Sequence, residues 1–459
     1  MTLRSQSDKE RPRTTCPALG GLWILAGLSC ASATQAQEMV NAEDLSAKLS
    51  GQTEAPAAPL EIDLNSRFET QLAFSDLIEL EQFVEAIPVG QRLLELIEQE
   101  TGPESKDTAM ILADLAEVER VAGIHDSSET HFLRAIEIIR SADGTYSETV
   151  IGPLLGLGSN YHDRGDYLEA RVVFEEARTV NRRIFGLLNE GQIDILDLIS
   201  QTLSNMNLFV EAHEKQLEGL RLMERKHGED TIEVLPAIYK YAQWLGRNGL
   251  YQAERGQYRR AMSIIRKKLS RESIYMVTPL RETGNSFRRQ KLGEGQGLSS
   301  LKRALMILEA QDNTDALATA QTLRDIGDWN IAFSKVGPFD VEYRRAWNLL
   351  ADTENSEELR NAWFHDPDYV LFVSPSRRGV STFQEPDMEP GHVLVTFDIN
   401  ELGRANNVNV LEAIPLELKN ETVVASIRRS RFRPRFVDGE AVPATGLARR
   451  FVYFYKPDE

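Results

Sequence analysis

The stretch LLGLGSNYHDRGDYLEARVVFEEA, residues 154–177, contains two helix-forming segments separated by a short turn. The turn is indicated by Gly165 and Asp166, because glycine and aspartate favour the backbone angles that end a helix. Small and large apolar residues lie at helical spacing on both sides of this turn. The first helix contains Leu157, Gly158 and Tyr161, and one face of the second contains Ala170, Phe174 and Ala177.

The position of Ala177 recurs along the chain with a nearly constant period. Five of the six spacings are 42 residues and one is 43, and the equivalent positions are Leu93, Ala135, Ala177, Gly219, Ala261, Ala304 and Ala346. A small residue at this position allows two antiparallel helices to approach closely, and replacing Ala177 with leucine should overpack the contact by about 1–3 kcal/mol. The chain therefore repeats one pair of helices about seven times, between residues 66 and 356.

This pattern resembles the tetratricopeptide repeat, and the 42-residue period resembles the longer variant found in kinesin light chains. The match is uneven, because Leu93 is large, the fifth repeat has one extra residue before Ala261, and KLGEGQGLSS at residues 291–300 is rich in glycine. The resemblance implies an α-solenoid whose concave face binds a protein or peptide. A spacer that only holds another part of the chain at a distance is equally compatible with the residues.

The sequence changes character after the repeats. The stretch DPDYVLFVSPSRRGVSTFQEPDMEPG, residues 366–391, is rich in proline, serine and glycine. We interpret residues 357–390 as a linker with one short strand, residues 369–373. From residue 391 apolar residues alternate, with Val393, Val395, Phe397 and Ile399 on one face of a predicted strand. We predict a second strand around Val408 and Val410, a helix over residues 417–429, and an aromatic last strand over residues 447–455.

The order strand, strand, helix, strand in residues 391–457 resembles the C-terminal domain of TonB-family proteins. Three segments carry the resemblance: GHVLVTFDINELGRANNVNVLEA for the hairpin, VVASIRRSRFRP for the helix exit and GLARRFVYFYKP for the last strand. Ser430 stands where family members commonly carry tryptophan. The fold expected is therefore mainly α, with a solenoid followed by a small α+β module of ββαβ order, and we expect this module to fold on its own.

In the TonB family the module captures an extended segment of an outer-membrane receptor, which adds as a strand to the sheet edge. An edge strand suits this role because its backbone N–H and C=O groups on one side lack partners. The resemblance implies that the corresponding edge here, with arginines flanking it, contains Leu447, Arg449, Arg450, Phe451, Val452, Tyr453, Phe454 and Tyr455. The alternative is that this strand is an ordinary sheet component, covered by another copy of the chain.

Five arginines lie in SIRRSRFRPRF, residues 426–436. Arg431, Arg433 and Arg435 alternate with apolar residues, so we expect them on a solvent-facing side of an extended segment. Arg428 and Arg429 lie in the last turn of the predicted helix, where positive charge is favourable. The net charge of −18 argues against nucleic-acid binding, so we predict a structural role for the cluster.

The N-terminal residues resemble an export signal. Basic residues precede the apolar run PALGGLWILAGLSCASA, and small residues follow it, so we predict a signal peptide over residues 1–36 and a flexible segment over residues 37–65. The apolar core, residues 18–30, would span only about 20 Å as a helix, which is shorter than a bilayer core. We expect a periplasmic protein that binds other envelope proteins. The alternative is a TonB-type energy transducer for outer-membrane transport whose leader stays in the inner membrane.

The sequence contains no pattern typical of an enzyme. Both cysteines, Cys16 and Cys30, lie in the predicted leader, so the exported chain would have neither a disulfide nor a thiolate metal site. The seven histidines are scattered, and the sequence has no nucleophile elbow and no phosphate-binding glycine loop. We therefore predict no catalytic residues, no cofactor and no metal, and a protein as the partner.

Overall fold

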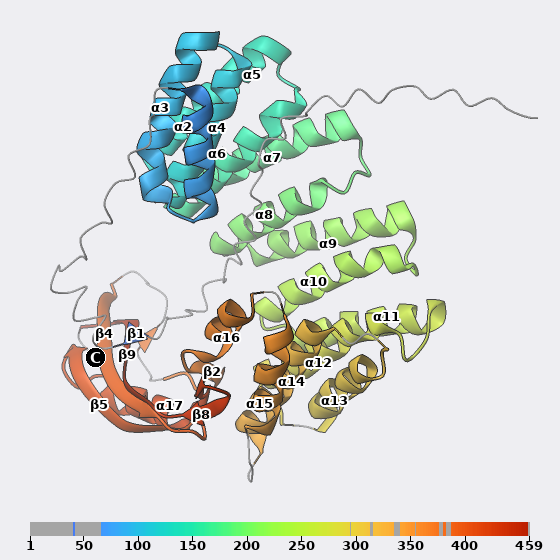
Figure 1. Cartoon of the computed structure of the whole chain (residues 1–459), viewed down its shortest axis with the longest axis vertical. Coiled ribbons are helices and arrows are strands. Elements are labelled where there is room, and N and C mark those ends of the chain that lie inside the picture. Colours follow the sequence, from blue (N-terminus) through green and yellow to red (C-terminus); the bar gives the residue numbers. More distant parts are fainter. Residues whose placement is uncertain are drawn as a thin grey trace, which may run out of the picture. The chain divides into compact units, whose positions relative to one another are not determined.

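The computed structural model describes residues 40–41, 66–293, 295–312, 315–334, 340–353, 355–375, 380–381 and 387–457. These residues belong to two compact units (Figure 1). The first unit contains the described residues up to Asn160, and the second contains residues 40–41 and the described residues from Tyr161 onward. Over the described ranges, no helix is both long and apolar enough to cross a membrane. The predicted leader, residues 1–36, lies outside these ranges.

The first unit consists of antiparallel helices joined by short turns. Serine residues cap the N-termini of two of these helices. The side chain of Ser66 accepts a hydrogen bond from the N–H of Glu69, and that of Ser105 accepts one from the N–H of Thr108. The elements are α2 (Arg67–Glu79), α3 (Phe83–Thr101), α4 (Lys106–Val121), α5 (His125–Asp143), η1 (Glu148–Val150) and the first part of α6 (Ile151–Arg164).

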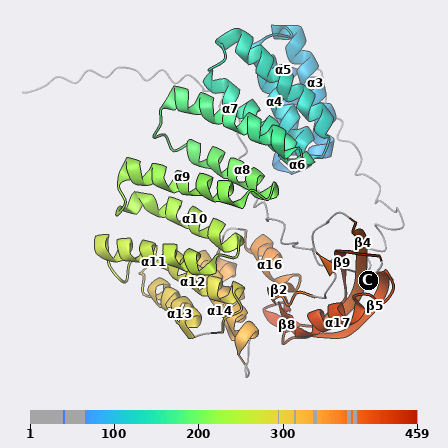
Figure 2. The ribbon, with the colours of Figure 1, turned by 180° about the vertical axis from the view of Figure 1, so that it is seen from behind.

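The second unit continues the same pattern of helix pairs and then changes to strands. Its helices are α7 (Tyr167–Phe185), α8 (Gln192–Asn205), α9 (Phe209–His227), η2 (Ile232–Val234), α10 (Leu235–Arg247), α11 (Tyr251–Lys268), η3 (Ile274–Met276), α12 (Val277–Arg289), α13 (Gly295–Glu309), α14 (Ala316–Phe333), α15 (Val341–Leu349), η4 (Leu350–Asp352) and α16 (Ser356–Phe364). The predicted series of helix pairs is therefore present, and the chain is mainly helical (Figure 2).

Six described turns inside the helix pairs, from the one between α2 and α3 to the one between α12 and α13, share one backbone conformation. At each of these six turns one residue has a positive φ, and the N–H of the following residue donates to a carbonyl five residues back, as from Asp166 to Tyr161 at 2.8 Å. Turns of this form recur in step with the period of the small residues, and their positive-φ residues are Glu81, Gly123, Gly165, Asn207, Gly249 and Lys291.

The small residues of the repeat period lie in the second helix of each pair. All seven equivalent positions are buried, from Leu93 in α3 to Ala346 in α15. Ala135, Ala177, Ala261, Ala304 and Ala346 are each 0% exposed, so even a methyl group at this position is fully enclosed. This burial agrees with the packing reason given for the period.

The C-terminal module is an antiparallel sheet with one helix packed on one face. Its long strands are β4 (Glu389–Ile399), β5 (Ala405–Ile414) and β9 (Ala444–Tyr455), and its helix is α17 (Asn420–Arg429), which begins three residues later than predicted. The sheet order is β1-β9-β4-β5, where β1 is Val40–Asn41, and β3 (Val380–Ser381) also pairs with β9. The core under α17 contains the four residues predicted to share a face: Val393, Val395, Phe397 and Ile399.

Two small strand pairs extend the predicted ββαβ order. Strand β2 (Asp368–Leu371) pairs with β6 (Arg431–Arg433), and β7 (Arg435–Val437) pairs with β8 (Glu440–Val442). Both β6 and β7 lie in the arginine-rich segment between α17 and β9.

The segment expected to be a linker, residues 357–390, is structured at its beginning. It contains nearly all of α16, and β2 follows that helix. Phe364 of α16, Val370 of β2 and Phe436 of β7 pack in one core with helices α14 and α15. The last helix pair and the C-terminal module therefore share a hydrophobic core, where the sequence suggested two parts joined by a linker.

Candidate strand-binding site

Strand β9 is the centre of the candidate site because it contains every residue of the predicted edge. It pairs with β4 along its length, from Tyr455 opposite Glu389 to Ala444 opposite Ile399. Its side chains alternate between the two faces of the sheet. The core under α17 receives Leu447, Phe451 and Tyr453, whereas Arg450 and Val452 are exposed.

Tyr453 is fixed from two directions. Its side chain is fully buried, and its hydroxyl group donates to the carbonyl oxygen of Ile414 at 3.2 Å. The ammonium group of Lys419 lies 4.7 Å from the centre of the Tyr453 ring, and burial lowers the pKa of Lys419. Tyr453 therefore supports the sheet and is not available to a partner through its side chain.

Arg449 does not flank the edge in solvent, as we expected, but lies within the packed layer. Only 6% of the residue is exposed, and its guanidinium group lies 4.4 Å from the centre of the Tyr369 ring and 5.6 Å from that of Phe372. Burial lowers the pKa of Arg449. Strand β2 and the residues after it cover this position, and the sequence could not indicate that, because Tyr369 lies before the whole of the predicted module.

The second side of β9 is partly occupied by the chain itself. Val40 and Asn41 of β1 pair with Ala448 and Leu447, and Val380 and Ser381 of β3 pair with Tyr455 and Phe454. Between these two short strands, residues 449–453 have β4 as their only neighbouring strand in the described parts of the chain. We call the central three of them, residues 450–452, the edge window. The prediction of a free edge over all of residues 447–455 is therefore too broad.

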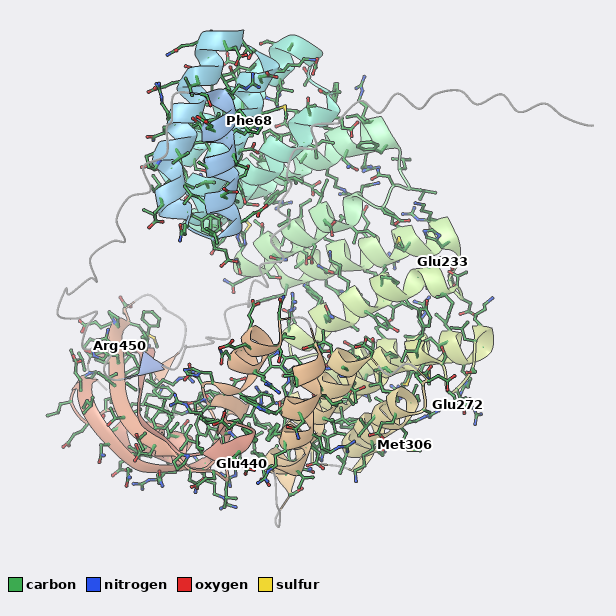
Figure 3. The ribbon with its side chains drawn as sticks, viewed as in Figure 1. Phe68, Glu233, Glu272, Met306, Glu440 and Arg450 are labelled. Carbon is green, nitrogen blue, oxygen red and sulfur yellow. The ribbon has the colours of Figure 1, made fainter. Side chains whose placement is uncertain are left out.

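The exposed face beside the edge window contains three charged or titratable side chains. Nε2 of His392 lies 3.1 Å from Nη2 of Arg450 and 3.1 Å from Oε1 of Glu412. Arg450 and Glu412 are about half exposed, with side-chain exposures of 56% and 47%. A strand added beside the window would meet Arg450 and the exposed Val452 on this face (Figure 3 labels Arg450).

Within the arginine-rich segment, the position of Arg433 differs from the one predicted. Arg433 was expected in solvent, but it is buried and forms two hydrogen bonds with Asp328 of α14, from Nε to Oδ1 and from Nη2 to Oδ2, both at 3.0 Å. Its Nη1 also donates to the carbonyl oxygen of Trp363 at 3.0 Å. Alternation predicted the face correctly for Phe432 and Phe436, which are buried, but it could not reveal an acidic partner 105 residues away.

Asp328 is surrounded by groups that favour its charged form. Burial alone would raise the pKa of Asp328, but Arg433 and Arg288 outweigh this effect, so the pKa lies below its ordinary value. The hydroxyl group of Tyr343 donates to Oδ1 of Asp328 at 2.8 Å. Arg288 also donates from Nη1 to the carbonyl oxygen of Val370 at 2.7 Å, which connects α12 to β2.

Two neighbouring arginines also contact the protein. Arg435 donates from Nε to the carbonyl oxygen of His365 at 2.7 Å and pairs with Asp366 at 3.0 Å. Arg431 donates from Nη1 to the carbonyl oxygen of Ser430 at 2.9 Å. These contacts agree with a structural role for the cluster, because they direct the guanidinium groups to groups of the same chain.

The helix pairs contain polar contacts that the sequence analysis missed. Arg281 of α12 contacts Asp325 and Gln321 of α14, each at 2.9 Å or less, and Asn285 donates to Asp325 at 3.1 Å. Glu254 of α11 is fully buried and accepts a hydrogen bond from Ser286 at 2.6 Å. The sequence could have indicated these contacts, because the paired residues lie 32–44 positions apart, which is close to one repeat period.

The five residues predicted to pack the clearest repeat lie in α6 and α7, and all of them are buried or half-buried. Ala170, Phe174 and Ala177 are fully buried in α7. Gly158 is buried in α6, and Tyr161 is half-buried, with the guanidinium group of Arg164 lying 5.4 Å from the centre of its ring. Among the described residues, no group of three or more histidine, cysteine, aspartate or glutamate side chains is arranged to hold a metal ion.

Residues 154–190 match the tetratricopeptide repeat family. Tetratricopeptide repeat proteins mediate protein–protein interactions. No curated protein matches the chain. The match covers α7 and most of α6, which includes the stretch with the clearest repeat signature in the sequence.

Several solved structures are similar to part of the chain. A chain described as a kinesin light chain with nearly identical TPR-like repeats, from Podosopora anserina, is 13% identical, with coverage of 46% of this chain and 99% of that one and a TM-score of 0.38. BtubC from P. vanneervenii is 13% identical, with coverages of 56% and 96% and a TM-score of 0.34. The C-terminal part of a tetratricopeptide repeat-containing protein from Cytophaga hutchinsonii is 12% identical, with coverages of 62% and 97% and a TM-score of 0.37.

Proposed function

We propose that this chain is a periplasmic interaction protein whose C-terminal module binds an extended segment of an envelope or outer-membrane protein by strand addition. The observation that carries the proposal is the edge window of β9. Residues 450–452 lie in a 12-residue strand whose first side pairs with β4 continuously from Leu447 to Tyr455, while the second side of the window faces no described strand. Backbone groups on such an edge gain hydrogen bonds when an extended segment adds.

The exposed side chains suggest which segments would fit. Arg450 favours an acidic residue opposite it, and Val452 favours an aliphatic or aromatic one, because cross-strand pairs of opposite charge or apolar character stabilise a sheet. The matching side chains of the segment would lie two residues apart, since residues on one face of a strand alternate. The periplasmic location rests on the leader-like residues 1–36 and on the absence of cysteine from the rest of the sequence.

The repeats would hold the module and offer a second protein-binding surface. Tetratricopeptide repeat proteins bind protein partners, and the core with α14 and α15 includes Val370 of β2 and Phe436 of β7, next to the sheet in the sequence. The second candidate, an inner-membrane energy transducer, differs in one measurable property. It requires residues 1–36 to persist in the membrane fraction, whereas the first requires a mature N-terminus near Gln37.

Photo-crosslinking in intact cells tests the proposal. A photoreactive amino acid at Val452, which is 38% exposed beside the window, should capture an envelope protein. The same amino acid at Met306 of α13, which is 68% exposed, is the matched control (Figure 3 labels Met306). Capture of one envelope protein from Val452 and not from Met306 supports the proposal. No adduct from Val452, or the same adducts from both positions, contradicts it.

A further inference from the structure

The two short strands on the second side of β9 differ in how they are held. Strand β3 lies between β2 and β4 in the sequence and is joined to each of them by a short connection, so its position is restrained on both sides. Strand β1 consists of Val40 and Asn41 alone, and the next described residue is Ser66. The sequence between β1 and α2 is longer than the sequence on either side of β3, and the entropy cost of closing a loop grows with its length.

Strand β1 lies directly beside the edge window. It pairs with Ala448 and Leu447 in an antiparallel register, and its pairing ends two residues before Arg450. A segment of up to about five residues fits opposite residues 449–453, between the two short strands, whereas a longer strand would need the backbone groups of Ala448 or Phe454 as well. When such a longer segment binds, one of the chain's own strands must leave, and β1 is the less restrained of the two.

We propose that the N-terminal segment around Val40–Asn41 is an intramolecular occupant of the β9 edge, and that a partner strand replaces it. The occupancy by β1 stands on the observed pairing, and only the identity of the replacing strand rests on the proposed function. A competing strand binds only to molecules in which the edge is open. Its apparent affinity is therefore its intrinsic affinity multiplied by the fraction of such molecules. The affinity for a partner is thereby set by the chain itself.

When β1 of the chain itself is prevented from pairing with β9, a separate peptide with the sequence of β1 should bind to the same edge. The full chain with Val40→Pro and Asn41→Pro loses the backbone N–H groups that β1 can donate, because proline has none. A fluorescent peptide of residues 36–46 should bind this variant about tenfold more tightly than it binds the unmodified chain, as measured by fluorescence anisotropy. The matched control is Val40→Ala with Asn41→Ala, which keeps the backbone donors and should behave like the unmodified chain.

Two further arms make the outcome specific to the β9 edge. A peptide with proline at both positions should not bind the proline variant, and amide hydrogen exchange at Leu447 and Ala448 should be faster in the proline variant than in the alanine control. Equal binding of the peptide to the unmodified chain and to both variants, or no binding to the proline variant, overturns the proposal.

The outcome separates this inference from the proposed function. If the peptide binds as predicted but no envelope protein is crosslinked from Val452, the role of β1 is supported and the proposed envelope partner is contradicted. A crosslinked envelope protein whose capture is the same in the proline variant and in the alanine control keeps the partner and overturns the role of β1.

Discussion

The ion pair between Asp328 and Arg433 illustrates how one buried contact can fix the position of a whole module. Both side chains are almost fully enclosed, with exposures of 4% and 8%, and they form two parallel hydrogen bonds. Removing two charges from water is unfavourable, so such a pair stabilises a fold only when both partners are present. Each partner therefore depends on the other, although they lie in different parts of the chain.

Replacing Arg433 with methionine should lower the free energy of unfolding by about 3–5 kcal/mol, because Asp328 would remain buried without its main partner. Replacing Asp328 with leucine as well should recover a large part of that loss, since no buried carboxylate without its main partner would remain at this position. Chemical denaturation followed by circular dichroism measures both variants. A double variant as unstable as Arg433→Met would show that the pair is not coupled.

The same pair gives the stability a defined dependence on pH. Because the pKa of Asp328 in the folded chain lies below its ordinary value of about 3.9, the pair stabilises the fold fully above about pH 4 and loses its effect as the pH falls further. The difference in unfolding free energy between the unmodified chain and Asp328→Asn should therefore be large at pH 7 and shrink below pH 4. A difference that stays constant down to pH 3 would contradict this assignment.

Gly219 is the one glycine among the seven equivalent positions of the repeat period, and we predict that alanine at this position stabilises the fold. A methyl group there would lie 3.9 Å from Cδ1 of Leu196, which is ordinary contact, and alanine is favoured over glycine inside a helix by about 1 kcal/mol. Thermal unfolding of Gly219→Ala should show a higher midpoint. Gly284→Ala is the control and should destabilise, because its methyl group would lie 2.5 Å from Cγ of Leu301.

At the scale of the element, the six repeated turns have different residue types at the position with a positive φ. Lys291 has a φ of 62° and Gly249 a φ of 74°, so both occupy the left-handed region. Glycine adopts this region without the steric penalty that other residues have, which is about 1–2 kcal/mol.

Lys291→Gly should therefore raise the free energy of unfolding by up to about 1 kcal/mol, after the greater freedom of glycine in the unfolded chain is subtracted. Gly249→Ala should lower it by a similar amount, and nothing lies within 4 Å of its new methyl group, so only the backbone changes. Urea denaturation compares the two variants. Equal effects of both substitutions would show that φ does not control these turns.

The elements predicted well are those whose signal is local. Ala170, Phe174 and Ala177 lie on one face of a helix, and the apolar residues of β4 alternate along one strand. The burial of both sets follows from their spacing alone. Arg433 also follows an alternation, but its partner Asp328 lies 105 residues away. The pairing of β1 with β9 joins the first described residues of the chain to its last strand, and no local pattern could reveal it.

At the scale of the whole molecule, the C-terminal module is joined to the last helix pair by packing and by charge. Phe436 of β7 lies among Tyr343, Trp347 and Phe364, with ring centres 5.2–6.5 Å apart. Arg433 and its neighbours add polar contacts to α14 and α16 across the same boundary. The interface therefore has the composition of a protein core, which implies that module and helices unfold together.

We accordingly predict that a fragment of residues 387–459 does not fold stably, in contrast to our expectation from the sequence. It would expose Phe436 and leave Arg433 without Asp328, and a domain of about 70 residues has little core to offset such losses. A fragment of residues 277–459 keeps α12 to α16 and should give a cooperative unfolding transition by circular dichroism. If the shorter fragment shows dispersed amide resonances and unfolds cooperatively, the shared core is dispensable, and the sheet edge could act at a distance from the repeats.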